Sequence, residues 1–72
     1  MKIILSDHTE ANLVIRGIDG WKVKEVAKSA TWKKIQDDGT IAARKDFEGK
    51  MLEVIYAEYP KKKIIITAYY VD

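Results

Sequence analysis

The sequence predicts a small α+β domain in which two helices are followed by an antiparallel β-meander, in the order β-α-α-β-β-β-β. Two patterns predict this: apolar residues recur at helical spacing in residues 7–30, and apolar and polar residues alternate from residue 31 onwards. The 72 residues suffice for a single domain, which we expect to span residues 1–72. A helical hairpin of this kind is expected to pack on one face of the sheet and leave the other face partly open.

The first helix is expected between a short apolar strand at residues 2–5 and a glycine. Asp7 has the character of an N-cap, with Glu10 three residues later, as in an acidic capping box. Gly17 is expected to end the helix in the left-handed conformation. The helical spacing assigns the buried face to four residues, Ala11, Val14, Ile15 and Ile18.

The second helix is expected to begin at Asp19, a second N-cap residue. Its apolar residues, at i, i+3, i+4 and i+7, are Val23, Val26, Ala27 and Ala30. The connection between the helices is so short that a tight helical hairpin is expected. On the sheet side, we expect this hairpin to contact Leu52, Val54, Ile64 and Ile66.

The later strands are expected at residues 31–36, 41–47, 51–59 and 64–71, because turn sequences separate these segments. The last segment is apolar on both faces, so we place it inside the sheet and not at an edge. The run Lys61-Lys62-Lys63 is expected to be a solvated turn, and phosphate binding is the alternative.

Composition excludes several classes of site. There is no cysteine, so the chain has no disulfide and no thiolate zinc site, and a single histidine cannot form an all-imidazole site. A net charge of +2 is compatible with nucleic-acid binding but does not by itself indicate it. No apolar stretch approaches the roughly 20 residues of a membrane span, and we expect a cytosolic protein. A domain this small often relies on a partner chain.

The first helix carries a polar stripe of candidate functional residues. His8, Asn12 and Arg16 lie four residues apart, so all three project from one side of the helix. Two interpretations remain open from spacing alone. Either these side chains tie the helix to the sheet, or they line a cleft.

The last strand carries a second group of candidates. Alternation places Thr67 and Tyr69 on the face opposite Tyr70, so only one side of this group can share a cleft with the helices. Strand tyrosines are usually packing residues with a satisfied hydroxyl group. The functional alternative is base stacking, or proton transfer near a phosphate.

Arg44 and Lys45 are adjacent in a predicted strand and therefore point to opposite faces. An arginine in the middle of a sheet needs a partner, and the candidates are Glu53, Asp46 or an anion. Trp21, beside the second helix, indicates a core or rim position, or an interface.

The sequence has no Gly-rich phosphate loop, no HExxH motif and no serine or cysteine nucleophile with a histidine partner. An enzyme built from these residues is therefore expected to work without a metal or cofactor. RNA cleavage through the 2′-hydroxyl suits such a set, because the substrate supplies the nucleophile and the protein adds base, acid and phosphate neutralisation.

Several short motifs resemble a widespread family of small uncharacterised domains, in which a histidine starts the first helix and Arg-Gly-Ile ends it. The matching segments cover nearly the whole chain and are Ser6-Asp7-His8, Arg16-Gly17-Ile18, Val23 and Val26, the Asp-Asp-Gly turn, Gly49 to Val54 and Ile65 to Tyr70. That family is similar to the BrnT toxins of the RelE/ParE-like superfamily of toxin–antitoxin systems. Asn12-Leu13, followed by Arg16-Gly17-Ile18, resembles the BrnT segment Asn-Leu…Lys-His-Gly-Val.

The resemblance implies a ribonuclease fold and a protein antitoxin as partner, with His8 and Arg16 on the helix and Thr67 and Tyr69 on the last strand as site residues. Our first hypothesis is a toxin-like, metal-independent endoribonuclease. Its predicted catalytic residues are His8, Arg16 and Tyr69, and its predicted RNA-binding residues are Asn12, Arg44, Lys45, Thr67 and Tyr70. The alternative is a non-catalytic protein-interaction module or a homodimeric domain.

Overall fold

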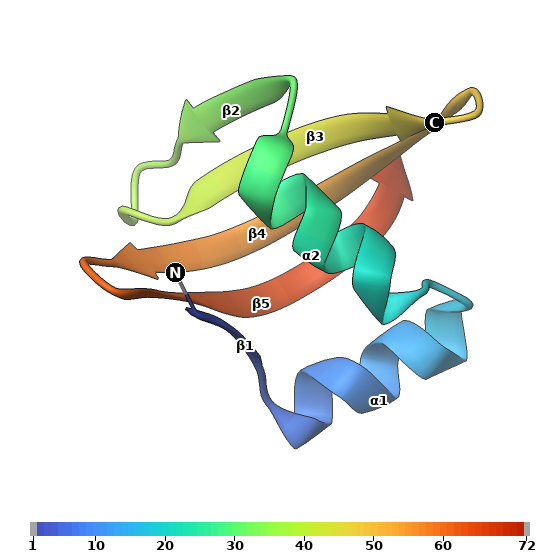
Figure 1. Cartoon of the computed structure of the whole chain (residues 1–72), viewed down its shortest axis with the longest axis horizontal. Helices are drawn as coiled ribbons and strands as arrows, with labels where there is room; N and C mark the ends of the chain where they lie inside the picture. The colour runs from blue at the N-terminus through green and yellow to red at the C-terminus, as the bar shows by residue number, and fades with distance from the viewer. Residues whose placement is uncertain (1, 72) are drawn as a thin grey trace.

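The computed structural model describes residues 2–71, and its elements follow the predicted order (Figure 1). They are β1 (Lys2–Leu5), α1 (Asp7–Arg16), α2 (Gly20–Ser29), β2 (Trp32–Ile35), β3 (Ile41–Phe47), β4 (Lys50–Tyr59) and β5 (Lys62–Val71). The α+β class, with the helices packed against the sheet, is therefore confirmed.

The sheet has five strands in the order β1-β5-β4-β3-β2. The pairs formed by β2 to β5 are antiparallel, as predicted. The expectation of a wholly antiparallel sheet is wrong for β1, which pairs with β5 in parallel and places Ile4 opposite Ile64. Because β5 lies between β1 and β4, the prediction of an interior last strand is confirmed.

A β-bulge in β5 corrects two of the predicted core positions. The pairing with β4 skips Ile66, which lies between two paired residues, Ile65 and Thr67. The bulge shifts the side-chain alternation by one residue. As a result Ile65 and Ala68 are buried under the helices, whereas Ile64 is only half-buried and Ile66 is exposed.

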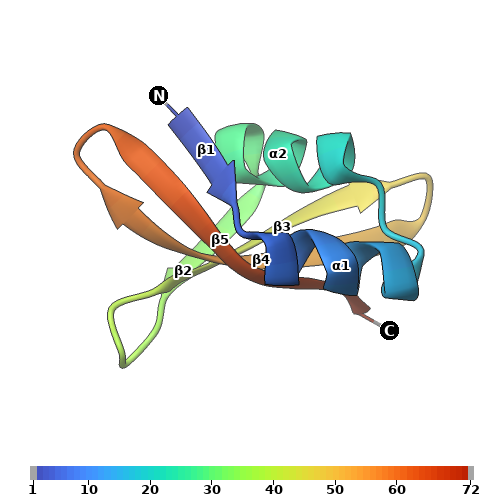
Figure 2. The ribbon, with the colours of Figure 1, turned by 90° about the horizontal axis from the view of Figure 1, so that it is seen from below.

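The second helix packs as predicted. Asp19 is its N-cap, and Val23, Val26 and Ala27 are buried. They join Leu52 and other β3, β4 and β5 residues in a single apolar core. Figure 2 shows α2 lying across one face of the sheet. The opposite face carries no helix within residues 2–71 (Figure 2).

The first helix differs from the prediction in its phase. Its N-cap is Ser6 and not Asp7, because the Ser6 hydroxyl group accepts a hydrogen bond of 3.1 Å from the Thr9 amide. Gly17 ends the helix at φ 68°, as predicted. The helix buries Thr9 and Leu13. Of the predicted buried face only Ile18, just after the helix, is buried, and the other three residues are exposed: Ala11, Val14 and Ile15.

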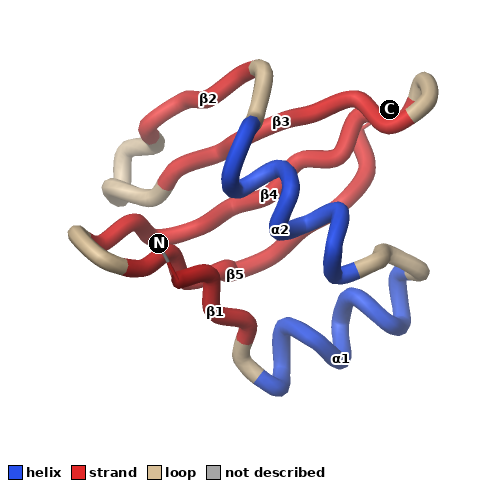
Figure 3. The backbone as a smooth tube through the Cα atoms, viewed as in Figure 1, coloured by secondary structure: helices blue, strands red, loops and turns tan. Residues whose placement is uncertain are grey.

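The reason is the position of α1 beside the edge of β5, where β1 has ended (Figure 3). Thr9 Oγ1 donates hydrogen bonds to the carbonyl oxygens of Ile65 at 3.3 Å and Ile66 at 3.5 Å. Arg16 donates one of 2.8 Å to the carbonyl oxygen of Ala68. The helix therefore protects a strand edge that would otherwise be open to another chain.

The lysine run is also not wholly solvated, because Lys63 is buried. Its ammonium group donates a hydrogen bond of 2.6 Å to the carbonyl oxygen of Ala27, and it lies 4.9 Å from the ring centroid of Tyr56. A cation at the C-terminal turn of a helix is favourable, so Lys63 fastens the end of α2 to the sheet. Within residues 2–71, no helix is long and apolar enough to cross a membrane.

Candidate functional site

A row of four paired side chains crosses the face of the sheet that no helix of residues 2–71 covers. Trp32 of β2 pairs with Arg44 of β3, Arg44 pairs with Glu53 of β4, and Glu53 pairs with Tyr69 of β5. Directly paired residues share one face of a sheet, so the register alone brings these four together.

The four side chains form one connected network. The guanidinium carbon of Arg44 lies 4.7 Å from the ring centroid of Trp32. The Nε of Arg44 donates a hydrogen bond of 2.5 Å to one carboxylate oxygen of Glu53. The Tyr69 hydroxyl group donates a short hydrogen bond to the other oxygen. Of the partners considered for Arg44, the structure therefore selects Glu53.

The network fixes the protonation of its members. Burial alone would raise the pKa of Glu53, but the hydrogen bonds from Tyr69 and Arg44 and the charge of Arg44 outweigh it and lower that pKa. The bond to Glu53, aided by burial, raises the pKa of the Tyr69 hydroxyl group. At neutral pH the network therefore holds an ionised carboxylate and a neutral phenol.

A second row of paired residues runs beside the first. Lys34 pairs with Ala42, Ala42 with Ile55, and Ile55 with Thr67. Arg16 reaches the end of this row from α1, where it donates a hydrogen bond of 3.0 Å to the Thr67 hydroxyl group. We call the two rows together the open face.

On the open face the two aromatic side chains are partly exposed, whereas the carboxylate group that they flank is buried. Glu53 is only 5% exposed, whereas Tyr69 is 39% and Trp32 is 43% exposed. Ala42 and Ile55, in the middle of the second row, are buried. The rings and the cations of Arg16, Lys34 and Arg44 therefore surround buried residues, of which Ala42 and Ile55 are apolar.

The structure brings some predicted site residues together and separates others. It places Arg44, Thr67, Tyr69 and the end of the Arg16 side chain on the open face. His8 is exposed on α1, and its Nε2 lies 3.3 Å from the side-chain amide nitrogen of Asn12, Nδ2. Arg16 lies eight positions after His8 on the helix, a distance of about 12 Å along the axis. Arg16 thus ties the helix to the sheet, and His8 does not.

Lys45 and Tyr70 lie on the covered face. The ammonium group of Lys45 donates hydrogen bonds of 2.7 Å to Glu25 and 3.0 Å to Ser29, both on α2. Tyr70 packs against the core, and the Lys50 ammonium group lies 5.9 Å from its ring centroid. These residues therefore do not share a surface with Arg44 and Tyr69.

The sequence interpretation did not assign Trp32 and Glu53 to the site. The tight turn at Glu48-Gly49, with φ values of 55° and 89°, fixes the register between β3 and β4 and thus sets Arg44 opposite Glu53. That signal is present in the sequence. The position of Tyr69 opposite Glu53 depends on the β-bulge at Ile66, and no pattern of residues in the sequence predicts that bulge.

Within residues 2–71, no group of three or more histidine, cysteine, aspartate or glutamate side chains is placed to hold a metal ion. No family model, curated protein or solved structure matches the chain.

Proposed function

We propose that the protein binds RNA on the open face of its sheet, as a toxin-like domain. The observation that carries this proposal is the row Trp32–Arg44–Glu53–Tyr69, which combines two outward aromatic rings with a guanidinium group on an uncovered sheet.

Unpaired bases stack on aromatic side chains, and such stacking contributes about 1–3 kcal/mol per base. Trp32 and Tyr69 present rings for this purpose at the two ends of the row. Lys34, Arg44 and Arg16 supply positive charge to which the phosphates between stacked bases bind. A flat sheet with exposed rings is an established way of holding splayed, single-stranded RNA.

Cleavage of the bound RNA is the more specific part of the proposal. The Arg44 guanidinium group would neutralise the phosphate, and Glu53 would accept the proton of the 2′-hydroxyl group. Tyr69, whose hydroxyl group is protonated at neutral pH, would donate its proton to the leaving oxygen and would regain one from Glu53 through their hydrogen bond. In this arrangement His8 is not the proton carrier, since it lies on α1 outside the network.

The first test is a binding titration with labelled single-stranded RNA. Arg44→Gln should weaken binding and reduce its salt dependence, because a phosphate contact is lost. Lys45→Gln is the matched control, since it removes the same charge from the adjacent residue on the covered face. Trp32→Ala should weaken binding by about 1–3 kcal/mol and leaves the Arg44–Glu53 pair intact. Equal loss in Arg44→Gln and Lys45→Gln would contradict the proposed face.

The second test concerns cleavage. Wild type should cut RNA and leave an otherwise identical strand uncut if a 2′-deoxy residue stands at the cleavage position. Tyr69→Phe should lower the rate by roughly two to four orders of magnitude, with unchanged RNA affinity, because the proton donor is lost and the aromatic ring is kept. His8→Ala should leave the rate unchanged. A large loss of rate in His8→Ala at constant stability would contradict this assignment and would indicate that His8 on α1 carries the proton.

A second candidate function, a non-catalytic protein-interaction module, is favoured by the large apolar side chains that α1 exposes. Absence of RNA binding in a folded, associating protein would support it.

A further inference from the structure

The outer side of the two helices carries an apolar patch that nothing in residues 2–71 covers. Val14 is 79%, Ile15 81% and Trp21 62% exposed. Ala11 extends the patch along α1, and all of its α1 residues belong to the stripe whose spacing predicted burial. Single exposed apolar residues are ordinary, but a contiguous group on a helix indicates a contact surface.

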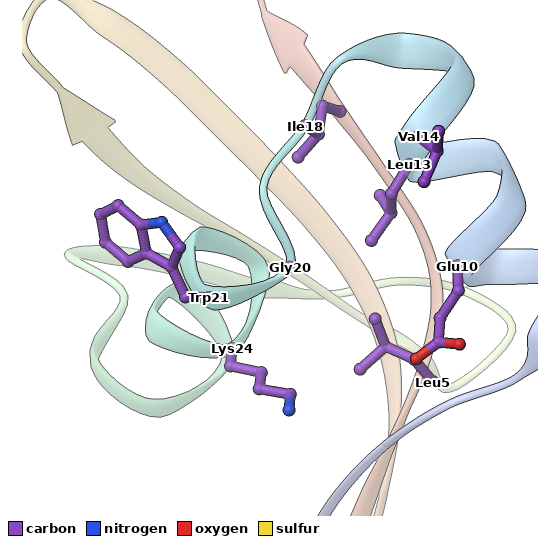
Figure 4. Close-up of a pocket in the computed structure, with 8 residues that line it drawn as sticks. All are labelled: Leu5, Glu10, Leu13, Val14, Ile18, Gly20, Trp21 and Lys24. Atoms are coloured by element: carbon purple, nitrogen blue, oxygen red, sulfur yellow. The ribbon is translucent and has the colours of Figure 1, made fainter.

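The patch continues into a hollow between α1 and α2 with a volume of about 320 Å³. Leu5, Leu13 and Ile18 line it, and Val14 and Trp21 stand at its sides (Figure 4). The hollow exists because α1 lies at the strand edge and not against α2, so the two helices leave a gap over the core.

Opposite charges border the hollow. On one side, α1 presents Glu10, with Asp7 in the same helical turn, and on the other side α2 presents Lys24, with Lys28 one turn later. Both Glu10, on α1, and Lys24, on α2, line the hollow (Figure 4). Within residues 2–71 neither of them forms an ion pair.

We infer that this surface binds a second copy of the chain about a twofold axis that runs along the hollow. Such a rotation sets α1 of one copy against α2 of the other. On each side of the axis, Glu10 of one copy then faces Lys24 of the other copy. Val14 and Ile15 face the partner's Trp21. An isologous contact requires a surface that complements itself, and an apolar centre between one acidic and one basic side meets this requirement.

The charges argue against a strongly acidic or strongly basic partner, because one of the two sides would repel it. Association also suits a 72-residue chain with no cysteine, whose core is limited by its size. The inference is independent of the proposed RNA site, since α2 and the open face lie on opposite faces of the sheet (Figure 2).

The test is sedimentation equilibrium of the full chain over a wide concentration range. Wild type should approach twice the 8.3 kDa mass of the monomer. Ile15→Glu should weaken dimerisation about tenfold or more, without lowering the melting temperature of dilute protein, because the side chain is already exposed in the monomer. Ile35→Glu is the matched control, since Ile35 on β2 is 75% exposed and lies outside the patch. It should leave the dimer unchanged.

Charge exchange tests the direction of the axis. Glu10→Lys and Lys24→Glu should each weaken the dimer, because each brings like charges together across the interface. The double variant restores opposite charges and should recover most of the wild-type affinity. A monomer at every concentration, a dimer insensitive to Ile15→Glu, or a double variant no better than the single ones would overturn the inference. A monomer that instead binds a foreign amphipathic helix at this patch would likewise overturn it.

Discussion

The two helices are similar in length and in apolar periodicity, but they are attached to the sheet in different ways. The second helix lies on the face of the sheet and buries Val23, Val26 and Ala27 completely. The first lies beside an edge and is held by Leu13 and by hydrogen bonds from Thr9 and Arg16 to main-chain carbonyl groups of β5.

An amphipathic pattern therefore identifies the apolar side of a helix but not the surface that covers it. For α2 the covering surface is the protein's own sheet. For α1 the apolar stripe is left outside, and we propose that a second copy covers it. The helix can be held at the edge because bulged and unpaired carbonyl groups of β5 need donors there.

The largest contrast is expected from one acidic substitution placed in each stripe. Val26→Asp puts an uncompensated charge into the core and should lower the free energy of unfolding by several kcal/mol, enough to unfold a small domain. Ile15→Asp should change that free energy by less than about 0.5 kcal/mol. Circular-dichroism melts of dilute protein measure both. Comparable destabilisation by the two variants would mean that α1 also lies on the face of the sheet.

A smaller effect is expected from the edge contacts of α1. Thr9→Val keeps the shape of the side chain but removes the hydroxyl group that donates to the carbonyl oxygens of Ile65 and Ile66. The free energy of unfolding should fall by about 1 kcal/mol, the usual net contribution of one hydrogen bond. Thr9→Ser retains the donor and should recover much of the loss. If Thr9→Val melts like wild type, these bonds do not hold α1 at the edge.

The smallest effect is expected from acid, and of the two helices it should loosen the attachment of α2 and not that of α1. The hydrogen bond from Lys45, followed by that from Ser29, lowers the pKa of Glu25, which joins α2 to β3. A carboxylate with a lowered pKa stabilises the fold above its ordinary pKa, and this contribution disappears as pH falls through the folded-state value.

The measurement is a series of melts from neutral pH to about pH 3, where carboxylates become protonated. The difference in melting temperature between wild type and Glu25→Gln should close over this range. The difference between wild type and Arg16→Gln should persist, because Arg16 donates to Thr67 and a carbonyl group that do not titrate. A pH-dependent Arg16→Gln difference would mean that an acidic group helps to hold α1.

Much of the fold could be predicted from the sequence, because local chemistry fixed it. Gly17 requires a positive φ at the end of α1, and the tight turn at Glu48-Gly49 sets the register of its hairpin. The apolar run of β5 indicates an interior strand. Part of the open face follows from the same signals, since that turn alone places Arg44 opposite Glu53.

Local sequence therefore predicts the order and approximate limits of the elements, the face that α2 buries, and the opposite orientations of Arg44 and Lys45. Each depends on neighbours a few residues away. Tertiary packing sets three further features: β1 pairs in parallel with β5, the bulge at Ile66 brings Tyr69 to Glu53, and α1 turns its apolar stripe outward. They depend on hydrogen bonds between groups far apart in the sequence, 16 residues for Tyr69 and Glu53 and 56 residues for Thr9 and Ile65, so no local pattern specifies them.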